Sequence, residues 1–461
     1  MSQLKTKQVE NSIIWRPTLD HNGGPRFLQI ADALQAAVAA GVLKPGDRLP
    51  PQRRLAQELN LDLTTITRAY EEARRRHLLE GRGAHGSYVA AAKVEFSGLL
   101  DLSLNTPPMP EGLDLDDMLK QGLAQVLLHT DTTQLLTYHQ AGGSAAERQA
   151  GAQWLMPILA KIDNENIVVC PGAQAALAAL ILSLATPGQV ILTEAVSYPG
   201  LIAAAQQFGR KLVSVASDQH GIVPEALAQA CRKYPVAFLY LNPTLHNPST
   251  ITMPAARRQQ IAGIAQKFKL QIVEDDPYWL LADNPPAPLA RLLPQQVCYI
   301  ASLAKCLTPG LRLAYVVLPS SSAREAFLQA LRTFALMTTP LTAALALQWL
   351  GDGTAQRLLA AVREEASQRQ RIAHAILAGY NATEGQGLHL WLTLPSYWQA
   401  QQFAEAAANA GLAVSPAHAF AITTPAPNAI RICLGSIRSR AHLQTALQQL
   451  SQLLAQRPAC N

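Results

Sequence analysis

Hydrophobic positions near the start of the chain recur at helical spacing. Apolar residues three or four positions apart predict a helix from about Arg26 to Ala40. A Pro-Gly turn at residues 44–47 ends this helix, and a second helix is expected over residues 52–59. The polar residues 1–24 that precede the first helix are expected to be loosely ordered.

A short polar turn follows the second predicted helix. A third helix begins near Thr64, with Asp62 as its N-cap and apolar residues along one face. Two helices joined by such a turn form a helix-turn-helix. Two short strands follow at residues 78–80 and 87–89, joined by a glycine-rich segment. The first ninety residues are therefore predicted to form a winged helix.

The pattern changes after about residue 100. Short apolar runs such as IVVC at residues 167–170 alternate with alanine- and leucine-rich helical stretches. Such runs are typical of strands buried in a mostly parallel sheet. Beyond about residue 340 the chain becomes helical and then returns to strands, which predicts a smaller α+β subdomain. We therefore expect an α/β protein in three parts: a winged helix-turn-helix at 1–90, a linker at 91–103 and a large domain at 104–461.

Charge is distributed unevenly along the chain. The 461 residues are 49% hydrophobic and 15% charged, as expected for a globular protein. The formal net charge is +6, and residues 1–90 contribute +4 of it, with 13 Lys/Arg against 9 Asp/Glu. Positive charge on a predicted winged helix favours an anionic partner such as double-stranded DNA.

The cysteines and the apolar runs constrain the compartment. The six cysteines are scattered, lie mostly in apolar runs and form no CxxC pair, so we expect reduced core thiols and no metal site. No uninterrupted apolar run reaches about 18 residues, so no membrane span is expected. The polar N-terminus also lacks the apolar stretch of a signal peptide. These features predict a cytoplasmic protein.

The predicted helix-turn-helix carries cationic and hydroxyl side chains that are candidate DNA contacts: Arg53, Thr64, Thr65, Thr67, Arg68 and Arg82. Arg53, in the second helix, can reach a phosphate or a guanine edge. The threonines lie at the start of the recognition helix, where hydroxyls and helix N–H groups meet DNA. Arg82 in the wing can contact the backbone or the minor groove. Arg68 is expected to face either the groove or the junction with the core.

This stretch resembles the winged helix-turn-helix of GntR-type regulators over about residues 26–90. The matching positions are Leu49, Pro50, Arg53, Leu55, Ala56, Arg68, Ala69 and Tyr70. The small core is expected to hold Leu55, Ala56, Leu59 and Ile66. The family usually has Ser-Arg at the start of the recognition helix, whereas this chain has Asp62-Leu63. A base-reading arginine is absent there, so the operators of relatives do not carry over.

Lys305 lies in the run SLAKCLTPGLR, directly after a predicted strand. An amine that loses its proton can attack an aldehyde. The neighbouring Ser302 hydroxyl and Arg312 guanidinium can hold a phosphate. The run resembles the lysine segment that binds pyridoxal 5′-phosphate (PLP) in class I/II aminotransferases of fold type I.

The resemblance extends to residues that occur in a fixed order along the chain: Gly172, Ala173, Gln174, Tyr198, Asn247, Asp275, Tyr278, Ser302 and Arg312. It implies that the turn at residues 172–174 opens a helix whose N–H groups bind the cofactor phosphate. Tyr198 stacks on the pyridine ring, and Asn247 and Tyr278 hydrogen-bond its phenolic oxygen. Asp275 pairs with the protonated ring nitrogen, which leaves Asp276 structural or solvent-facing.

Two further residues match positions that these enzymes use around the substrate. Arg431, in AIRICLG, resembles the arginine that binds a substrate α-carboxylate with two hydrogen bonds. Tyr138, in the altered segment YHQAGG, resembles the tyrosine that reaches the phosphate from the neighbouring subunit.

A GntR-like winged helix fused to an aminotransferase-like domain resembles the MocR subfamily of bacterial transcriptional regulators. The resemblance implies a homodimer that places two recognition helices on two half-sites. We hypothesise that the large domain senses PLP or an amino compound through aldimine exchange at Lys305, with the effector carboxylate on Arg431. An active aminotransferase with an appended DNA-binding domain is the alternative, and a PLP-dependent lyase or racemase also stays open.

Overall fold

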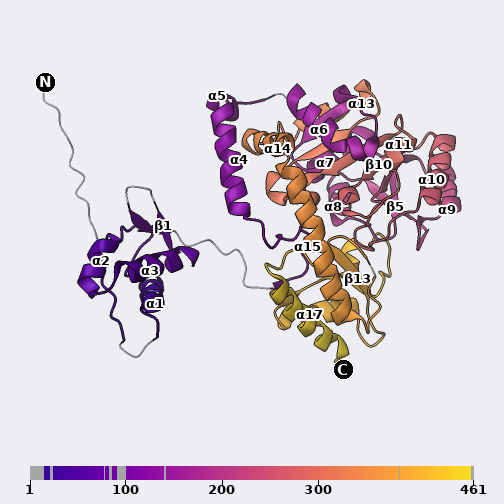
Figure 1. Cartoon of the computed structure of the whole chain (residues 1–461). Helices are drawn as coiled ribbons and strands as arrows, with labels where there is room; N and C mark the ends of the chain where they lie inside the picture. The colour runs from indigo at the N-terminus through magenta and orange to yellow at the C-terminus, as the bar shows by residue number, and fades with distance from the viewer. Residues whose placement is uncertain are drawn as a thin grey trace, which may run out of the picture. The chain divides into compact units, whose positions relative to one another are not determined.

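The computed structural model of the chain describes residues 15–20, 24–76, 78–81, 86–90, 100–139, 142–383 and 385–457. These residues form two compact units that divide between Gly98 and Leu99. Figure 1 shows the two units, each with its own helices and strands. Arg82 and Cys460 lie outside the described residues. The other five cysteines are free thiols, four of them buried. Among the helices described, none combines the length and the apolar character that a membrane span needs.

The first unit consists of a helical bundle and a two-stranded wing: α1 (Arg26–Ala39), α2 (Gln52–Leu59), α3 (Leu63–Arg75), β1 (Leu79–Gly81) and β2 (Ser87–Val89). The two strands are antiparallel, with Leu79 opposite Val89. The Asp62 carboxylate accepts a hydrogen bond from the Thr64 N–H at 2.7 Å, so it caps α3 as predicted. The predicted winged helix is confirmed, with element boundaries that agree within a residue or two.

The core of the first unit lies between α1, α2, α3 and the wing. Leu55, Ala56 and Ile66 are buried as predicted, while Leu59 packs at the edge of the cluster and is only partly buried. Trp15 is also buried in this core. The expectation of a loosely ordered start was therefore wrong for this residue, because its indole ring covers apolar surface that the helices leave open.

The second unit is built on a seven-stranded sheet. Its strands, in spatial order, are β4 (Ile167–Cys170), β12 (Ala314–Val317), β11 (Val297–Ser302), β10 (Gln271–Asp275), β9 (Val236–Leu241), β5 (Val190–Glu194) and β6 (Lys211–Val215). Only β12 runs antiparallel to its neighbours within this sheet, so the predicted mostly parallel sheet is confirmed. A short hairpin of β7 (Ser217–Asp218) and β8 (Gly221–Ile222) lies outside it.

Helices cover both faces of this sheet. Val168 and Val169 are consecutive in β4 and belong to different hydrophobic clusters, because successive side chains of a strand point to opposite faces. One cluster includes buried residues of α7 (Ala173–Leu184), α8 (Pro199–Gln207) and α13 (Ser321–Arg332). The other includes residues of α6 (Ala145–Leu159), α9 (Pro224–Lys233), α10 (Ala255–Phe268) and α14 (Pro340–Gly351). Shorter or peripheral helices are α4 (Leu115–His129), α5 (Thr132–Leu135), α11 (Leu289–Leu292) and α12 (Leu303–Cys306).

A smaller subdomain with its own core completes the second unit. It contains β13 (His389–Thr393), β16 (Ala429–Cys433), β15 (Ser415–Pro416), β14 (Leu412–Ala413), α16 (Ala400–Asn409) and α17 (Arg440–Ala455). The long helix α15 (Thr354–Leu377) runs from the large part into this subdomain (Figure 1). Leu358 packs in the core beside the sheet, whereas Leu377 packs in the subdomain core. The subdomain therefore begins inside α15, later than the predicted position near residue 340.

The subdomain also includes residues from the start of the second unit, about three hundred positions earlier in the sequence. Leu100–Asp101 form β3, which pairs in parallel with β14. Leu102 is fully buried in the subdomain core. Residues 100–103, which the sequence placed in the linker, thus belong to the second unit, because their strand pairing and burial tie them to segments three hundred residues away.

Candidate functional site

Several predicted cofactor residues lie at or just beyond the carboxyl ends of strands of the seven-stranded sheet. Asp275 is the last residue of β10, Ser302 ends β11, and Gly172 follows β4. Ligands of open α/β sheets bind in this position, because the connections after parallel strands diverge there and leave a crevice. The parallel pairing of β9, β10 and β11 therefore gathers residues that are far apart in the sequence.

Asp275 is buried, and only one of its two carboxylate oxygens is hydrogen-bonded among the described residues. The Tyr240 hydroxyl donates a hydrogen bond to Asp275 Oδ2 at 2.8 Å. Asp275 Oδ1 is buried and has no hydrogen-bond partner among the described residues. Burial raises the pKa of this carboxyl group to about 6, against the opposing effects of the Tyr240 hydrogen bond and the charge of Lys305. An open, buried carboxylate oxygen fits an N–H donor such as a protonated pyridine nitrogen.

Lys305 lies near Asp275 in α12 and is partly buried. Desolvation lowers the pKa of its ammonium group to about 8, and the nearby Arg431 and Arg312 charges act in the same direction. A lowered pKa makes the neutral, nucleophilic amine accessible near neutral pH. The Lys305 Nζ donates a hydrogen bond to the main-chain carbonyl of Asn105. The chemistry that the sequence assigned to this lysine is therefore compatible with its surroundings.

An anion-binding arrangement lies at the start of α7. Gly172 has a φ of +91° and precedes the first helical residue. A Cβ atom on Gly172 would lie 2.9 Å from Arg312 Nη2, so the absence of a side chain lets the guanidinium pack against the helix N-terminus. Helix N–H groups and a guanidinium together suit a phosphate. Arg312 is exposed, which leaves its guanidinium open to a ligand.

Two other residues predicted at the phosphate have structural hydrogen bonds. The Gln174 side-chain amide donates to the Gly200 carbonyl at 2.9 Å, which joins the start of α7 to α8. The Ser302 hydroxyl accepts a hydrogen bond from the Ala304 N–H at 3.2 Å and caps α12. Ala173 is the first residue of α7.

Arg431 is buried in β16 and connects three segments. Its Nη1 donates to Asn247 Oδ1 and its Nη2 to the Ser103 carbonyl, both at 2.7 Å. The guanidinium also lies over the Phe420 ring, 4.7 Å from the centroid. Arg431 Nε is buried and finds no partner in the described part of the chain. A carboxylate that enters the site can therefore pair with this guanidinium.

The predicted tyrosines differ in their surroundings. Tyr278 is buried, and its hydroxyl accepts a hydrogen bond from Asn105 Nδ2 at 2.8 Å. Burial raises the pKa of Tyr198, and the charges of Asp275 and Arg312 act on the same hydroxyl. Tyr138 is 80% exposed, so one copy of the chain does not bring it into the site. Its predicted role depends on a second subunit.

Asp276 is buried, so the solvent-facing alternative for it was wrong. Its Oδ2 accepts a hydrogen bond from the Thr244 hydroxyl at 3.0 Å. Successive residues at a strand end point in opposite directions, which directs the Asp276 side chain away from that of Asp275. The structural role predicted as the other alternative agrees with this position.

Sequence reasoning missed several residues that touch the site. Asn242 holds the Asp275 carbonyl through its Nδ2 at 2.7 Å and accepts the Asn247 N–H at 2.8 Å. A polar residue directly after the buried β9 was a usable signal for Asn242. Ser103 and Asn105 carried no such signal, because they lie about 200 or more positions from Lys305 and Arg431 in sequence.

In the recognition helix of the first unit, the hydroxyls of Thr64 and Thr67 are already hydrogen-bonded within the unit. The Thr64 hydroxyl donates to Asp62 Oδ1 at 2.6 Å, and the Thr67 hydroxyl lies 2.9 Å from Gln52 Oε1 and from the Leu63 carbonyl oxygen. Thr65 is partly buried. These hydroxyls keep acceptor lone pairs for an incoming partner.

Some arginines of this unit form ion pairs with acidic side chains, whereas others do not. Arg53 is exposed and makes no hydrogen bond or ion pair with a described residue, whereas Arg54 pairs with Glu58 at 2.7 Å. Arg68 is also exposed, so it does not face the core junction. An open hollow between α2, α3 and the wing is lined by several residues that include Arg48, Arg53 and Arg74. Its cationic lining suits the DNA backbone.

Comparison with protein families agrees with this division. Residues 97–450 match the family described as aminotransferase class I and II, and residues 27–89 match bacterial regulatory proteins of the gntR family. Fold and site thus define a DNA-binding unit joined to an aminotransferase-like unit.

Similar proteins share this organisation over nearly their full lengths. The chain is 31% identical to the uncharacterized HTH-type transcriptional regulator YdeF of Bacillus subtilis, covering 95% of this chain and 96% of that protein. It is 26% identical to the vitamin B6 salvage pathway transcriptional repressor PtsJ of Salmonella typhimurium, over 92% and 98% of the two chains. The chain belongs to the MocR subfamily of GntR-type transcriptional regulators.

Solved structures confirm the fold of the second unit. An archaeal alanine:glyoxylate aminotransferase superposes with a TM-score of 0.72 at 24% identity, covering 78% of this chain and 91% of that one. The α-aminoadipate aminotransferase LysN of Thermus thermophilus, complexed with N-(5′-phosphopyridoxyl)-L-leucine, gives 0.71 at 24% identity over 77% and 92%. At this identity the likeness shows the fold alone.

Proposed function

We propose that this chain is a PLP-dependent sensor of an amino compound that controls transcription by binding double-stranded DNA. The observation that carries the proposal is the convergence of Lys305, Asp275 and Arg431 in a chain that also has a winged helix-turn-helix. A lysine with a lowered pKa, a carboxylate with an open oxygen and a buried guanidinium supply the groups that the cofactor and an α-amino acid need.

The residues fit the cofactor from one end to the other. Asp275 Oδ1 would accept the ring N–H, because it is the buried oxygen without a partner among the described residues. Arg312 and the N-terminus of α7 would hold the phosphate. Tyr198 would pack against the ring. When bound, PLP supplies an aldehyde that condenses reversibly with an amine.

Residues on the other side of the site suit the amino compound. Arg431 would bind its carboxylate, and Asn247 would keep the guanidinium oriented through the hydrogen bond at 2.7 Å. Lys305, neutral above a pKa of about 8, would accept or release a proton at Nζ as the incoming amine replaces it. Tyr278 and Asn247 would orient the phenolic oxygen of the cofactor.

The first unit would place α3 in the major groove, with Arg53 on the backbone and the hydroxyls of Thr64 and Thr65 near the base edges. A homodimer formed through the aminotransferase-like units would present two such helices to two half-sites and would bring Tyr138 to the partner's site. Such a regulator would act in the cytoplasm, where bacterial DNA lies.

The test measures DNA affinity of the purified full chain at fixed salt, with and without PLP and a panel of amino acids. DNA fragments are selected by the protein from a random pool, because the operator is not implied by the sequence. We expect PLP alone, or PLP with one amino acid, to change the affinity. Equal affinity under all conditions would contradict the proposal.

The alternative function is a working aminotransferase, and turnover separates it from a sensor. Incubation of the cofactor-loaded protein with an amino donor and a keto acid would yield a new amino acid and a new keto acid if the chain is an enzyme. We expect binding of the amino compound without sustained turnover, and we expect Arg431→Gln to abolish that binding while PLP is retained.

A further inference from the structure

The first described residues of the second unit pass through the candidate cofactor site. We call residues 100–106 the entry segment, because they follow the linker from the DNA-binding unit. The Ser103 carbonyl accepts a hydrogen bond from Arg431 Nη2 at 2.7 Å, and the Asn105 carbonyl accepts one from Lys305 Nζ. Two cations of the site, the one proposed for a carboxylate and the one proposed for the cofactor aldehyde, are thus bonded to the stretch of chain nearest the linker.

The start of the entry segment is fixed to the small subdomain. The Leu102 N–H donates to the Ala413 carbonyl at 2.8 Å, and the Leu102 carbonyl accepts the Cys433 N–H at 2.7 Å. The Leu102 side chain is fully buried in the subdomain core. The Ser436 hydroxyl donates to the Asp101 carbonyl. A displacement of the subdomain therefore carries the start of the entry segment with it.

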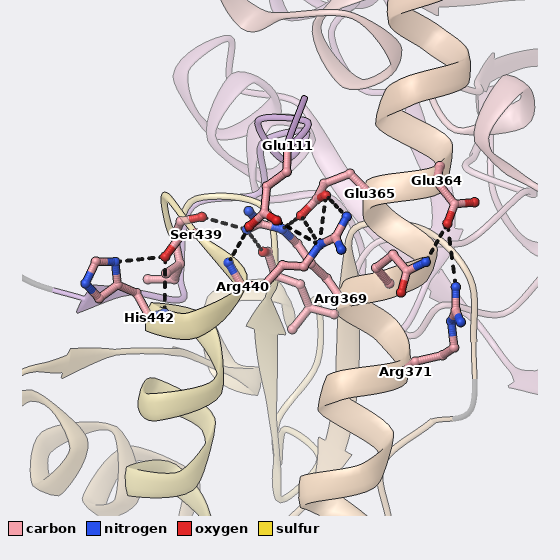
Figure 2. Close-up of polar contacts among 11 residues, drawn as sticks. Glu111, Glu364, Glu365, Arg369, Arg371, Ser439, Arg440 and His442 are labelled. Carbon is pink, nitrogen blue, oxygen red and sulfur yellow. Dashed lines mark hydrogen bonds and ion pairs between the residues drawn. The ribbon is translucent and has the colours of Figure 1, made fainter. Parts of the chain in front are cut away.

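A cluster of ions fixes the chain beyond the entry segment as well (Figure 2). Glu111 accepts the Arg440 N–H at 3.3 Å, and Arg440 Nη2 contacts Glu365 Oε2 at 2.6 Å. Glu365 also binds Arg369 Nε at 2.7 Å. Arg369 Nη1 donates to the carbonyls of Leu434 and Ile437. Breaking the buried Glu365–Arg369 pair would leave an uncompensated charge, so this part of the cluster resists displacement. The contact between Arg440 and Glu111 is partly exposed and contributes less.

Three side-chain hydrogen bonds cross from these subdomain-held residues to the sheet-based part of the unit. Arg431 Nη1 donates to Asn247, Lys305 donates to the Asn105 carbonyl, and Asn105 Nδ2 donates to the Tyr278 hydroxyl. A ligand that engages Lys305 removes one of these bonds. A carboxylate on Arg431 competes with Asn247 and with the Ser103 carbonyl for the same guanidinium.

We infer that the entry segment transmits ligand occupancy to the DNA-binding unit. Loading of Lys305 and Arg431 exchanges their bonds to Asn105, Ser103 and Asn247 for bonds to the ligand. The backbone hydrogen bonds from Ser197 N–H to the Phe420 carbonyl and from Ile422 N–H to the Ala195 carbonyl still join the subdomain to the sheet-based part. The subdomain and the entry segment then shift together, which moves the origin of the linker and biases the placement of the recognition helices. Ser103 and Asn105 are positioning residues in this scheme. The inference rests on the proposed function.

Hydrogen exchange on the full chain tests the first step. The probe is N-(5′-phosphopyridoxyl)-L-leucine, which combines the cofactor phosphate and ring with a carboxylate in one molecule. We expect the probe to change the exchange of peptides that contain the Leu102 and Cys433 amides, both hydrogen-bonded in the structure. The β5 peptide at residues 190–194, in the sheet, serves as the internal control. Unchanged exchange at Leu102 and Cys433 with probe bound would overturn the inference.

Substitutions away from the ligand test the second step. Ser436→Ala removes the hydrogen bond to Asp101 without touching Lys305 or Arg431. Ser439→Ala is the matched control, because Ser439 caps α17 and makes no hydrogen bond with the described residues of the entry segment. We expect both variants to bind the probe like the wild type. The ratio of DNA affinities with and without probe is expected to fall toward one in Ser436→Ala and to persist in Ser439→Ala.

Gly435→Ala is a second, stronger variant for the same step. A Cβ atom at this position would lie 1.8 Å from the Thr106 carbonyl oxygen, so the entry segment must move. Retained probe binding with a lost DNA response would support the inference. A DNA response equal to that of the wild type in both Ser436→Ala and Gly435→Ala would overturn it and leave the proposed function intact. A wild-type chain that binds no probe, or whose DNA affinity ignores the probe, would refute both.

Discussion

The two units differ in whether their polar groups already have partners. Within the described residues of the DNA-binding unit, no buried side-chain polar atom lacks a hydrogen bond. In the aminotransferase-like unit, Asn105 Oδ1, Asp275 Oδ1 and Arg431 Nε are buried around one site and have no partner there. Buried polar atoms are normally satisfied, so these three atoms suit a ligand that carries matching donors and acceptors. Other buried atoms of the unit, such as Trp349 Nε1 and Trp398 Nε1, also lack a partner among the described residues.

This difference reflects how each unit meets its partner. Of the described candidate DNA contacts, Arg53, Thr64 and Arg68 are exposed, so water satisfies their polar groups until a nucleic acid binds. In the candidate cofactor site the Asp275 and Arg431 side chains are buried. Their unbonded Oδ1 and Nε atoms are costly until a ligand satisfies them. Changes at the second site should therefore have larger and more specific effects than changes at the first.

Replacement of Lys305 should have the largest effect. Lys305→Ala removes the amine that we propose attacks the cofactor aldehyde, so the visible absorbance of covalently bound PLP should disappear entirely. Absorbance is measured after unbound cofactor has been removed by gel filtration. Lys120→Ala is the control, because Lys120 is exposed on α4 and pairs with Asp116 at 2.9 Å. Full absorbance in Lys305→Ala would contradict the assignment.

The second largest effect should be the pH dependence of the free energy of unfolding, caused by the buried Asp275 carboxyl group. Burial raises the pKa of Asp275 from 3.8 to about 6, so the folded state holds this proton more tightly than the unfolded state. The resulting stabilisation is present below pH 3.8 and lost as the pH rises through about 6. A shift of this size corresponds to roughly 3 kcal/mol. Denaturant unfolding of cofactor-free protein should show the loss, and Asp275→Asn should lack it; equal pH profiles would refute this.

Neutralisation of Asp275 should also weaken cofactor binding. Asp275→Asn replaces a charged acceptor with a neutral side chain, which costs about 1.5–3 kcal/mol for a hydrogen bond to a charged group. The dissociation constant of PLP, measured by absorbance titration, should rise roughly ten- to a hundredfold. Asp276→Asn is the matched control, because Asp276 is equally buried but bonds to Thr244. Equal weakening in both variants would argue against pairing with the ring nitrogen.

Adjacent arginines of α2 test the DNA-binding unit. Arg53→Ala should lower DNA affinity roughly tenfold and reduce the dependence of log affinity on log salt concentration by about one unit, as expected for a lost phosphate contact. Arg54→Ala should have a smaller effect, because Arg54 already pairs with Glu58. Fluorescence anisotropy at several salt concentrations measures both. The reverse ranking would place the DNA on another face.

Removal of a satisfied hydrogen bond should have the smallest effect. The buried Tyr70 hydroxyl donates to the Pro50 carbonyl at 2.7 Å. Tyr70→Phe should destabilise the DNA-binding unit by about 1 kcal/mol, the usual net value of such a bond. Hydrogen exchange of α3 amides would show the change, while β10 amides in the other unit should stay unaffected. An effect on β10 would contradict the separation into independent units.

Local signals predicted most of the elements. Asp62 caps α3 because its carboxylate is two residues from the Thr64 N–H, a relation visible in sequence. The buried strands were recognisable because both of their faces are apolar. Asp275, Lys305 and Arg431 occur along the chain in the order found in class I/II aminotransferases, and this resemblance predicted the site. Boundaries failed where burial depends on distant segments, as for Trp15 and for the division of α15.

The sequence by itself determined the two kinds of unit and the residue types that carry their chemistry. Only the tertiary structure decided which of those residues have a polar atom without a hydrogen-bond partner and which are already bonded. The Asn105 and Ser103 carbonyls reach Lys305 and Arg431 across about 200 or more positions, because β3 pairs with β14 and places the entry segment in the site. Main-chain carbonyls are present at every residue, so their role depends on where the fold brings them.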